Sequence, residues 1–82
     1  MHDRSIMDSL LRKIAALADE NGASRVTGIR VRLGATSHMD EAHFREHWED
    51  AVLGTPNADA TVEVEFSAEP FGVMLVDVEL ET

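Results

Sequence analysis

One alternating stretch sets the fold of this chain: Arg25-Val26-Thr27-Gly28-Ile29-Arg30-Val31-Arg32-Leu33. Its side chains fall on two faces of an extended chain, an apolar face with Thr27, Ile29, Val31 and Leu33 and a polar face with Gly28, Arg30 and Arg32. The stretch predicts a β-strand over residues 25–33 that Gly34 ends. Its apolar face must be covered by other parts of the chain.

Two amphipathic helices flank this strand and are expected to cover it. The first ends at Asn21-Gly22, and its apolar residues recur at helical spacing: Ile6, Met7, Leu10, Leu11, Ile14, Leu17 and Ala18. Ser5 and Asp8 resemble a capping box, so we expect residues 1–4 to precede this helix. The second helix is predicted from about Asp40 to Leu53, and one face carries Phe44, Trp48, Ala51 and Val52.

Two further strands are expected in the second half of the chain. In the earlier strand, polar residues alternate with the apolar residues Val62, Val64 and Phe66. In the later strand, Leu75, Asp77, Glu79 and Glu81 alternate with the apolar residues Met74, Val76, Val78 and Leu80. The short link Ser67-Ala68-Glu69-Pro70 suggests an antiparallel hairpin between these two strands. The first and second strands are separated by a helix, as in a right-handed parallel crossover. We therefore predict an α+β fold, a two-layer αβαββ arrangement in which both helices lie on one face of a three-stranded mixed sheet.

Composition narrows the classes of partner. The 82 residues include 16 acidic and 7 basic side chains, which argues against binding to nucleic acid or to an anionic membrane surface. There is no apolar run near 18 residues and no secretory start, so we expect a cytoplasmic protein. The length suits one domain over residues 1–82.

The chemistry of interest lies at the start of the chain, in Met1-His2. His2 can offer one metal ion its imidazole nitrogen, its own backbone nitrogen and the free amine of Met1. Nitrogen donors in one plane suit Ni(II) or Cu(II), whereas zinc sites are tetrahedral. This pattern predicts a binding mode and leaves the choice between nickel and copper open.

The continuation of this opening resembles a known family. Met1-His2-Asp3 followed by Ser5-Ile6-Met7-Asp8-Ser9-Leu10-Leu11 resembles the start of the HypA/HybF family, the nickel-inserting accessory proteins of hydrogenase maturation. Residues 21–27, 30–34 and 60–64, with Ser37, Phe44 and Gly54-Thr55, follow the family's order and spacing. The resemblance implies transient Ni(II) binding by Met1 and His2, with Asp3 where the family usually has Glu. It also implies a partner, either a nickel-enzyme maturation protein or an apo-enzyme subunit.

One feature of the resembled family is missing. Its members carry a zinc ribbon built on two C-x-x-C pairs, and this sequence contains no cysteine. The family inserts the ribbon between the last two strands, where this chain has only residues 67–70. We therefore expect a short turn in place of the ribbon and no structural zinc.

Other histidines could supply further donors. His38 and Asp40 lie just before the second helix, and they could complete a four-donor site if that helix start folds back toward residues 1–3. His43 and His47 are four residues apart, close enough on adjoining turns to share a metal. That pair lacks the Glu of an H-E-x-x-H motif. We interpret both as solvated helix residues, with His43 exposed and His47 bordering the apolar face.

Catalysis has little support in the sequence. It has no cysteine nucleophile, no Gly-rich phosphate loop and no serine elbow, so we predict a protein that is not an enzyme. Two functions remain. One is a metallochaperone that lends Ni(II) to a hydrogenase or urease maturation partner. The other is a metal-independent protein-interaction module in hydrogenase assembly. The oligomeric state is open in both.

Overall fold

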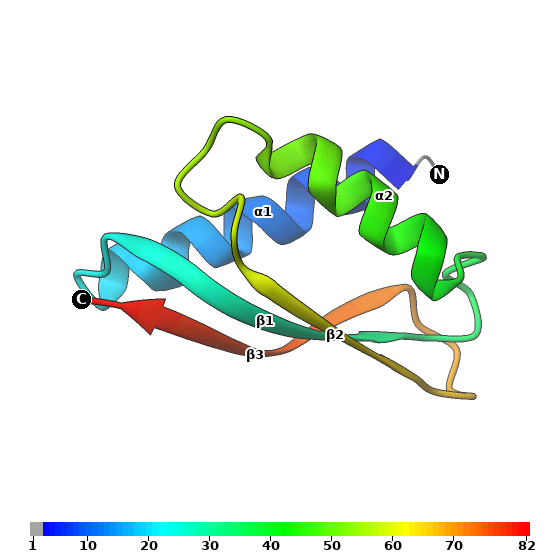
Figure 1. Cartoon of the computed structure of the whole chain (residues 1–82). Helices are drawn as coiled ribbons and strands as arrows, with labels where there is room; N and C mark the ends of the chain where they lie inside the picture. Colours follow the sequence, from blue (N-terminus) through cyan, green and yellow to red (C-terminus); the bar gives the residue numbers. More distant parts are fainter. Residues whose placement is uncertain (1–2) are drawn as a thin grey trace.

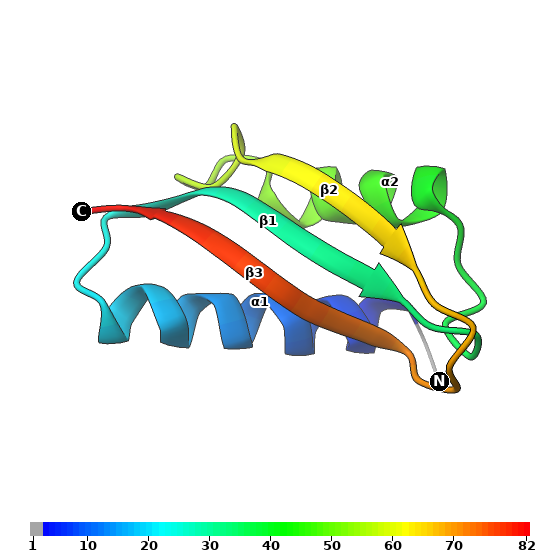
Figure 2. The ribbon, with the colours of Figure 1, turned by 90° about the horizontal axis from the view of Figure 1, so that it is seen from below.

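The computed structural model describes residues 3–82, and the elements follow the predicted αβαββ order. They are α1 (Asp3–Glu20), β1 (Arg25–Leu33), α2 (Glu41–Val52), β2 (Thr61–Phe66) and β3 (Val73–Glu81). The strands form one sheet, and both helices lie on the same face of it (Figure 1). Seen from below, with the sheet in front of the helices, α1 lies on the β3 side of the sheet and α2 on the β2 side (Figure 2). The predicted fold class is confirmed.

The order of the strands corrects one prediction. The sheet has the order β2-β1-β3, and β1 is parallel to β2 and antiparallel to β3. The parallel crossover through α2 is therefore confirmed, but the predicted hairpin between β2 and β3 is wrong because β1 lies between them. At the centre of the sheet β1 is the most buried strand, whereas β2 and β3 carry only half-buried and exposed residues.

The link between β2 and β3 crosses the end of β1. We call residues 67–72 the strap. The backbone N–H of Ser67 donates to the carbonyl of Leu33 (2.9 Å), and the N–H of Gly34 donates to the carbonyl of Gly72 (2.8 Å). A Cβ atom at Gly34 would collide with the backbone of Phe71. The strap is therefore fixed to the strand end by hydrogen bonds, and this close approach needs a glycine.

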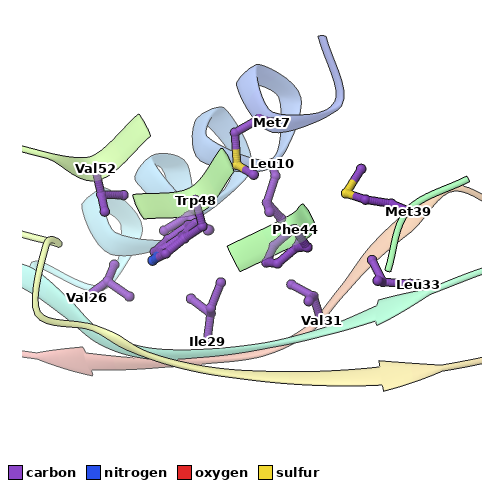
Figure 3. Close-up of a cluster of buried hydrophobic side chains, with 11 residues drawn as sticks. Met7, Leu10, Val26, Ile29, Val31, Leu33, Met39, Phe44, Trp48 and Val52 are labelled. Carbon is purple, nitrogen blue, oxygen red and sulfur yellow. The ribbon is translucent and has the colours of Figure 1, made fainter. Parts of the chain in front are cut away.

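The hydrophobic core lies between the helices and the sheet (Figure 3). Its buried members come from α1, β1, the loop before α2, and α2: Met7, Leu10, Ile14, Val26, Ile29, Val31, Leu33, Met39, Phe44, Trp48 and Val52. Trp48 is only 2% exposed. The predicted apolar faces of both helices are confirmed, because their stripes are the faces that pack here.

Irregular pairing of β1 with β3 shifts the predicted strand faces. Val26 is buried and Thr27 half-buried, because the pairing shifts between Val26 and Gly28. A second shift lies opposite Arg30 and Val31, and it leaves one β3 residue, Val76, without a partner. An extra residue of this kind reverses the alternation.

The second shift makes part of the β3 prediction wrong. Met74 and Val76 were predicted on the core face, but they are 43% and 37% exposed. Val73 and Leu75 pack against the core in their place. Phe66, at the end of β2, is 61% exposed and is a further departure from the predicted faces.

The ends of α1 are defined by different signals. The helix begins at Asp3, so the prediction that residues 3 and 4 precede it is wrong. The apolar stripe begins at Ile6, where the helix first meets the core. The backbone is already helical before that residue, so the stripe alone does not mark the start of the helix. Gly22 ends it as expected, with a left-handed backbone (φ 64°). The N–H of Ala23 donates to the carbonyl of Ala18 (2.9 Å), the bond of a Schellman motif.

The helix-free face of the sheet carries pairs of opposite charge. Arg30 contacts the carboxylate of Glu63 (3.3 Å), and Arg32 contacts that of Glu65 (2.9 Å). Both pairs join β1 to β2. They are partly exposed, so each stabilises the sheet by no more than about 1 kcal/mol. Within residues 3–82, neither helix is long and apolar enough to cross a membrane.

Candidate metal site

The predicted donors lie near one end of the molecule as far as the structure describes them. Met1 and His2 lie outside the described residues, and Asp3 is the first residue of α1. His38 and Asp40 belong to the loop between β1 and α2. In Figures 1 and 2 the start of α1 and this loop lie at the same end of the molecule, away from the C-terminus.

Buried side chains hold this loop in the same core as α1. Met39 joins the same core cluster as Met7 of α1 and Phe44 of α2 (Figure 3). Ser37 is also buried. Because these contacts tie both segments to one core, they fix where the loop and the first turns of α1 lie relative to each other.

His38 has an unusual backbone conformation. Its φ is 55°, in the left-handed region that few residues other than glycine adopt, although histidine adopts it more often than most. Its neighbours Ser37 and Met39 are buried while His38 is exposed. The left-handed turn lets both neighbours face inward, and it leaves the imidazole accessible to a metal ion.

Asp40 has a structural role as well as its predicted one. It is the N-cap of α2, and its Oδ1 accepts a hydrogen bond from the backbone N–H of His43 at 2.7 Å. A capping carboxylate satisfies one of the free N–H groups of the first helical turn. Asp40 is exposed, so its second oxygen can still bind a cation.

The described side chains do not form a metal site with three donors by themselves. Among the side chains of residues 5–82, no three histidines, aspartates or glutamates are grouped so that they could hold an ion. A site with three or more such side chains at this end would therefore draw on residues 1–3. The predicted set of Met1, His2 and Asp3, with His38 and Asp40, stays a prediction.

The two histidines of α2, His43 and His47, are exposed to the extent that the sequence predicted. His43 is exposed, and His47 is half-buried at the border of the apolar face. Their rings lie one helical turn apart with their centroids separated by 4.7 Å and their planes tilted by 35°. The spacing in the sequence predicted that the rings would be neighbours, but it could not predict how they are oriented.

A groove opens between α1 and the start of β3. It has a volume of about 450 Å³, and Ile6, Leu10 and Leu75 contribute to its apolar lining. Ser5, Ser9 and Lys13 supply its polar side chains. Since neither an imidazole nor a carboxylate lines it, this groove has none of the usual side-chain ligands of nickel.

Sequence reasoning missed two features at this end of the molecule. It did not anticipate the left-handed backbone of His38, for which the only signal is an exposed polar residue between Ser37 and Met39. It also did not separate the capping role of Asp40 from a ligand role. The signal was present, because Asp directly before an amphipathic stretch is a strong N-cap pattern.

The fold matches that of a solved nickel protein. The structure resembles the solution structure of the Ni metallochaperone HypA from Helicobacter pylori with a TM-score of 0.82. The match covers 100% of this chain and 99% of that chain at 17% sequence identity. At this level of identity the likeness shows a shared fold.

The sequence comparisons identify the family. A profile described as hydrogenase/urease nickel incorporation, metallochaperone, hypA matches residues 1–71. The chain is 33% identical over 64 residues to the hydrogenase maturation factor HypA of Rhizobium leguminosarum bv. viciae, and 32% identical over 65 residues to that of Methanopyrus kandleri. The protein belongs to the HypA family.

These relatives are longer than this chain. The matches cover 78% and 79% of the chain but only 57% and 46% of the two relatives. A match to the hydrogenase maturation factor HybF of Salmonella typhimurium, at 34% identity, covers 67% of the chain and 49% of that protein. The chain thus spans about half the length of the curated relatives that it matches.

Proposed function

We propose that this protein is a metallochaperone that binds Ni(II) at its N-terminus and lends it to a partner in the maturation of a nickel enzyme, a hydrogenase or a urease. The observation that supports this most is the family match, which begins at residue 1 and so includes the Met1-His2 chelate. Three nitrogen donors are available there from two residues. Asp3, His38 and Asp40 are the candidates for the remaining donor.

The geometry of the loop supports such a site. Met39 and Ser37 hold the loop in the core, so His38 and Asp40 stay at the surface near the end where α1 begins. A site built from a chain terminus and a surface loop keeps its ion close to solvent. A nearby partner can then offer competing ligands, as transfer of the ion requires.

The rest of the proposal follows from this role. The ion is cargo, held transiently, and we assign the protein no reaction of its own. The partner is a maturation protein or the apo-enzyme subunit, encountered in the cytoplasm. We assign the protein no structural zinc, and the hydrogen bonds that join the strap at residues 67–72 to the end of β1 support this.

A second candidate function is a metal-independent interaction module in hydrogenase assembly. It is favoured by the exposed apolar side chains of Met74 and Val76 on β3, a strand at the edge of the sheet. An edge strand presents unpaired backbone groups to a partner. In this alternative, His2 would have no part in the activity.

Replacement of the gene in its own host separates the two functions. We expect His2→Ala to reduce the activity of the nickel enzyme at least tenfold at limiting nickel, while His2→Ala protein is present at normal levels. His38→Asn serves as a control that changes a histidine outside the N-terminal chelate and should retain more of the activity. Full activity of the His2→Ala strain at limiting nickel would favour the interaction module.

A further inference from the structure

We propose that His43 and His47 form a second metal site on the flank of α2, one that takes a single divalent late transition-metal ion such as Ni(II) or Zn(II). The site is separate from the N-terminal chelate and does not depend on the proposed function. It rests on the geometry of two rings that α2 holds one turn apart.

The separation of the rings fits a shared ion. A metal ion bonds to an imidazole nitrogen at about 2.0–2.1 Å. Suppose that one nitrogen of each ring binds the same ion, and that the nitrogen–metal–nitrogen angle lies between its square-planar and its tetrahedral value. The ring centroids are then roughly 4.5–5.2 Å apart. The rings of His43 and His47 have a centroid separation of 4.7 Å, within this range. The centroid separation is therefore compatible with a shared ion, and binding requires each ring to turn one nitrogen toward it.

The charges around the pair favour a cation. Glu46 and Asp50 are exposed on the same flank of α2, since Glu46 comes three residues after His43 and Asp50 three residues after His47. The nearest basic residue in the helix sequence, Arg45, is held on the other flank. It contacts the carboxylate of Glu41 (2.8 Å) and donates to the carbonyl of Val62 (2.8 Å). A divalent ion beside the rings therefore meets a negative field and no close cation from α2.

The coordination would be open. Among the described residues, no histidine or carboxylate joins the pair to make a group of three that could hold an ion, so Glu46 and Asp50 would act through their field and water would fill the other coordination positions. Binding would exchange the present contacts of the two rings for bonds to the metal. An ion held by two imidazoles with several waters is weakly bound, and a partner can remove it easily.

Titration calorimetry on a blocked protein tests this site alone. The protein carries a histidine-free N-terminal extension and His2→Ala, so that the N-terminal chelate cannot form. We expect one Ni(II) or Zn(II) ion per chain. His43→Gln and His47→Gln should each weaken the binding at least tenfold, because each leaves a single imidazole. Glu49→Gln, the control, removes an exposed carboxylate from another side of α2 and should change it less than twofold.

Thermal unfolding gives an independent readout. Since the ion bridges two turns of the folded helix, saturating metal should raise the thermal midpoint of the blocked protein, and it should not raise that of His43→Gln or His47→Gln. Glutamine keeps a good helix former at each position, so all variants should fold. No binding by the blocked protein would overturn the proposal. So would a loss confined to one of the two variants, the behaviour of a lone imidazole. Either result leaves the N-terminal site untouched.

Discussion

The carboxylate of Asp40 caps α2 by accepting a hydrogen bond from the backbone N–H of His43, with 2.7 Å between Oδ1 and the nitrogen. The same residue is a predicted nickel donor. One side chain can do both, because the cap uses one oxygen and leaves the other for a cation. The two roles respond differently to substitution.

Asparagine at position 40 separates capping from metal binding. Asn caps helices as well as Asp does, so Asp40→Asn should keep the stability within a few tenths of a kcal/mol, whereas Asp40→Ala should lose about 0.5–2 kcal/mol. We expect both variants to bind Ni(II) roughly tenfold more weakly, a change of about 1.4 kcal/mol. Chemical denaturation and titration calorimetry measure the two effects. If the Asp40→Asn protein bound nickel with unchanged affinity, Asp40 would cap α2 but would not be a nickel ligand.

The core prediction concerns Trp48, which is buried between α2 and the sheet. Trp48→Ala should cost about 3–5 kcal/mol, because it removes a large buried ring and leaves a cavity. A loss of that size is comparable with the whole stability of a small domain. Denaturant unfolding followed by circular dichroism measures it. Leu53→Ala, at a residue 79% exposed, is the control and should stay within about 0.5 kcal/mol.

The strap is tested by two glycine substitutions. Gly34→Ala should destabilise the protein by about 1–3 kcal/mol, because its Cβ would collide with the backbone of Phe71. Gly72→Ala has open space for the same methyl group and should be close to neutral. Thermal midpoints of the two variants compare them directly. Equal midpoints would show that the strap does not cross the end of β1 as closely as described.

One ion pair, between Arg25 and Glu81, should make the stability of the fold depend on pH in the acid range. Arg25 hydrogen-bonds to Glu81, and this bond together with its charge lowers the pKa of the Glu81 carboxyl. The stabilisation is therefore complete above the ordinary glutamate pKa, about 4.3, and is lost as pH falls through the lowered value. Arg25→Gln should remove this small contribution at neutral pH and leave stability at lower pH unchanged. Thermal midpoints recorded between pH 7 and pH 2 would reveal a difference that closes on acidification, and a constant difference would contradict it.

The helices were predictable because their signal is local. Phe44, Trp48 and Val52 repeat at helical spacing, and the same residues are buried in the structure. The faces of β3 were not predictable in the same way. Val73-Met74-Leu75-Val76 is a continuous apolar run, so its alternation can be read in either phase. The unpaired residue that decides the phase arises from pairing with β1, which the sequence does not reveal.

The order of the strands also depends on distant residues. A short link at residues 67–70 favours a hairpin when considered alone. In the structure both β2 and β3 pair with β1, which therefore lies at the centre of the sheet, and the link alone does not reveal this pairing. For the candidate site, the chemistry of His2 was readable from the sequence because a terminal chelate needs no fold. The left-handed backbone of His38 was not, since burial of Ser37 and Met39 imposes it.

Nickel titration of protein with its native start tests the central claim most directly. The measurement should use untagged His43→Gln/His47→Gln protein, so that α2 contributes no second site. We predict about one Ni(II) per chain, with affinity falling as pH drops through the range where an amine, near 8, and an imidazole, near 6.5, take up protons. His2→Ala, or an uncleaved N-terminal tag that converts the Met1 amine into an amide, should each abolish binding. The same nickel affinity with and without His2 would contradict the metallochaperone account.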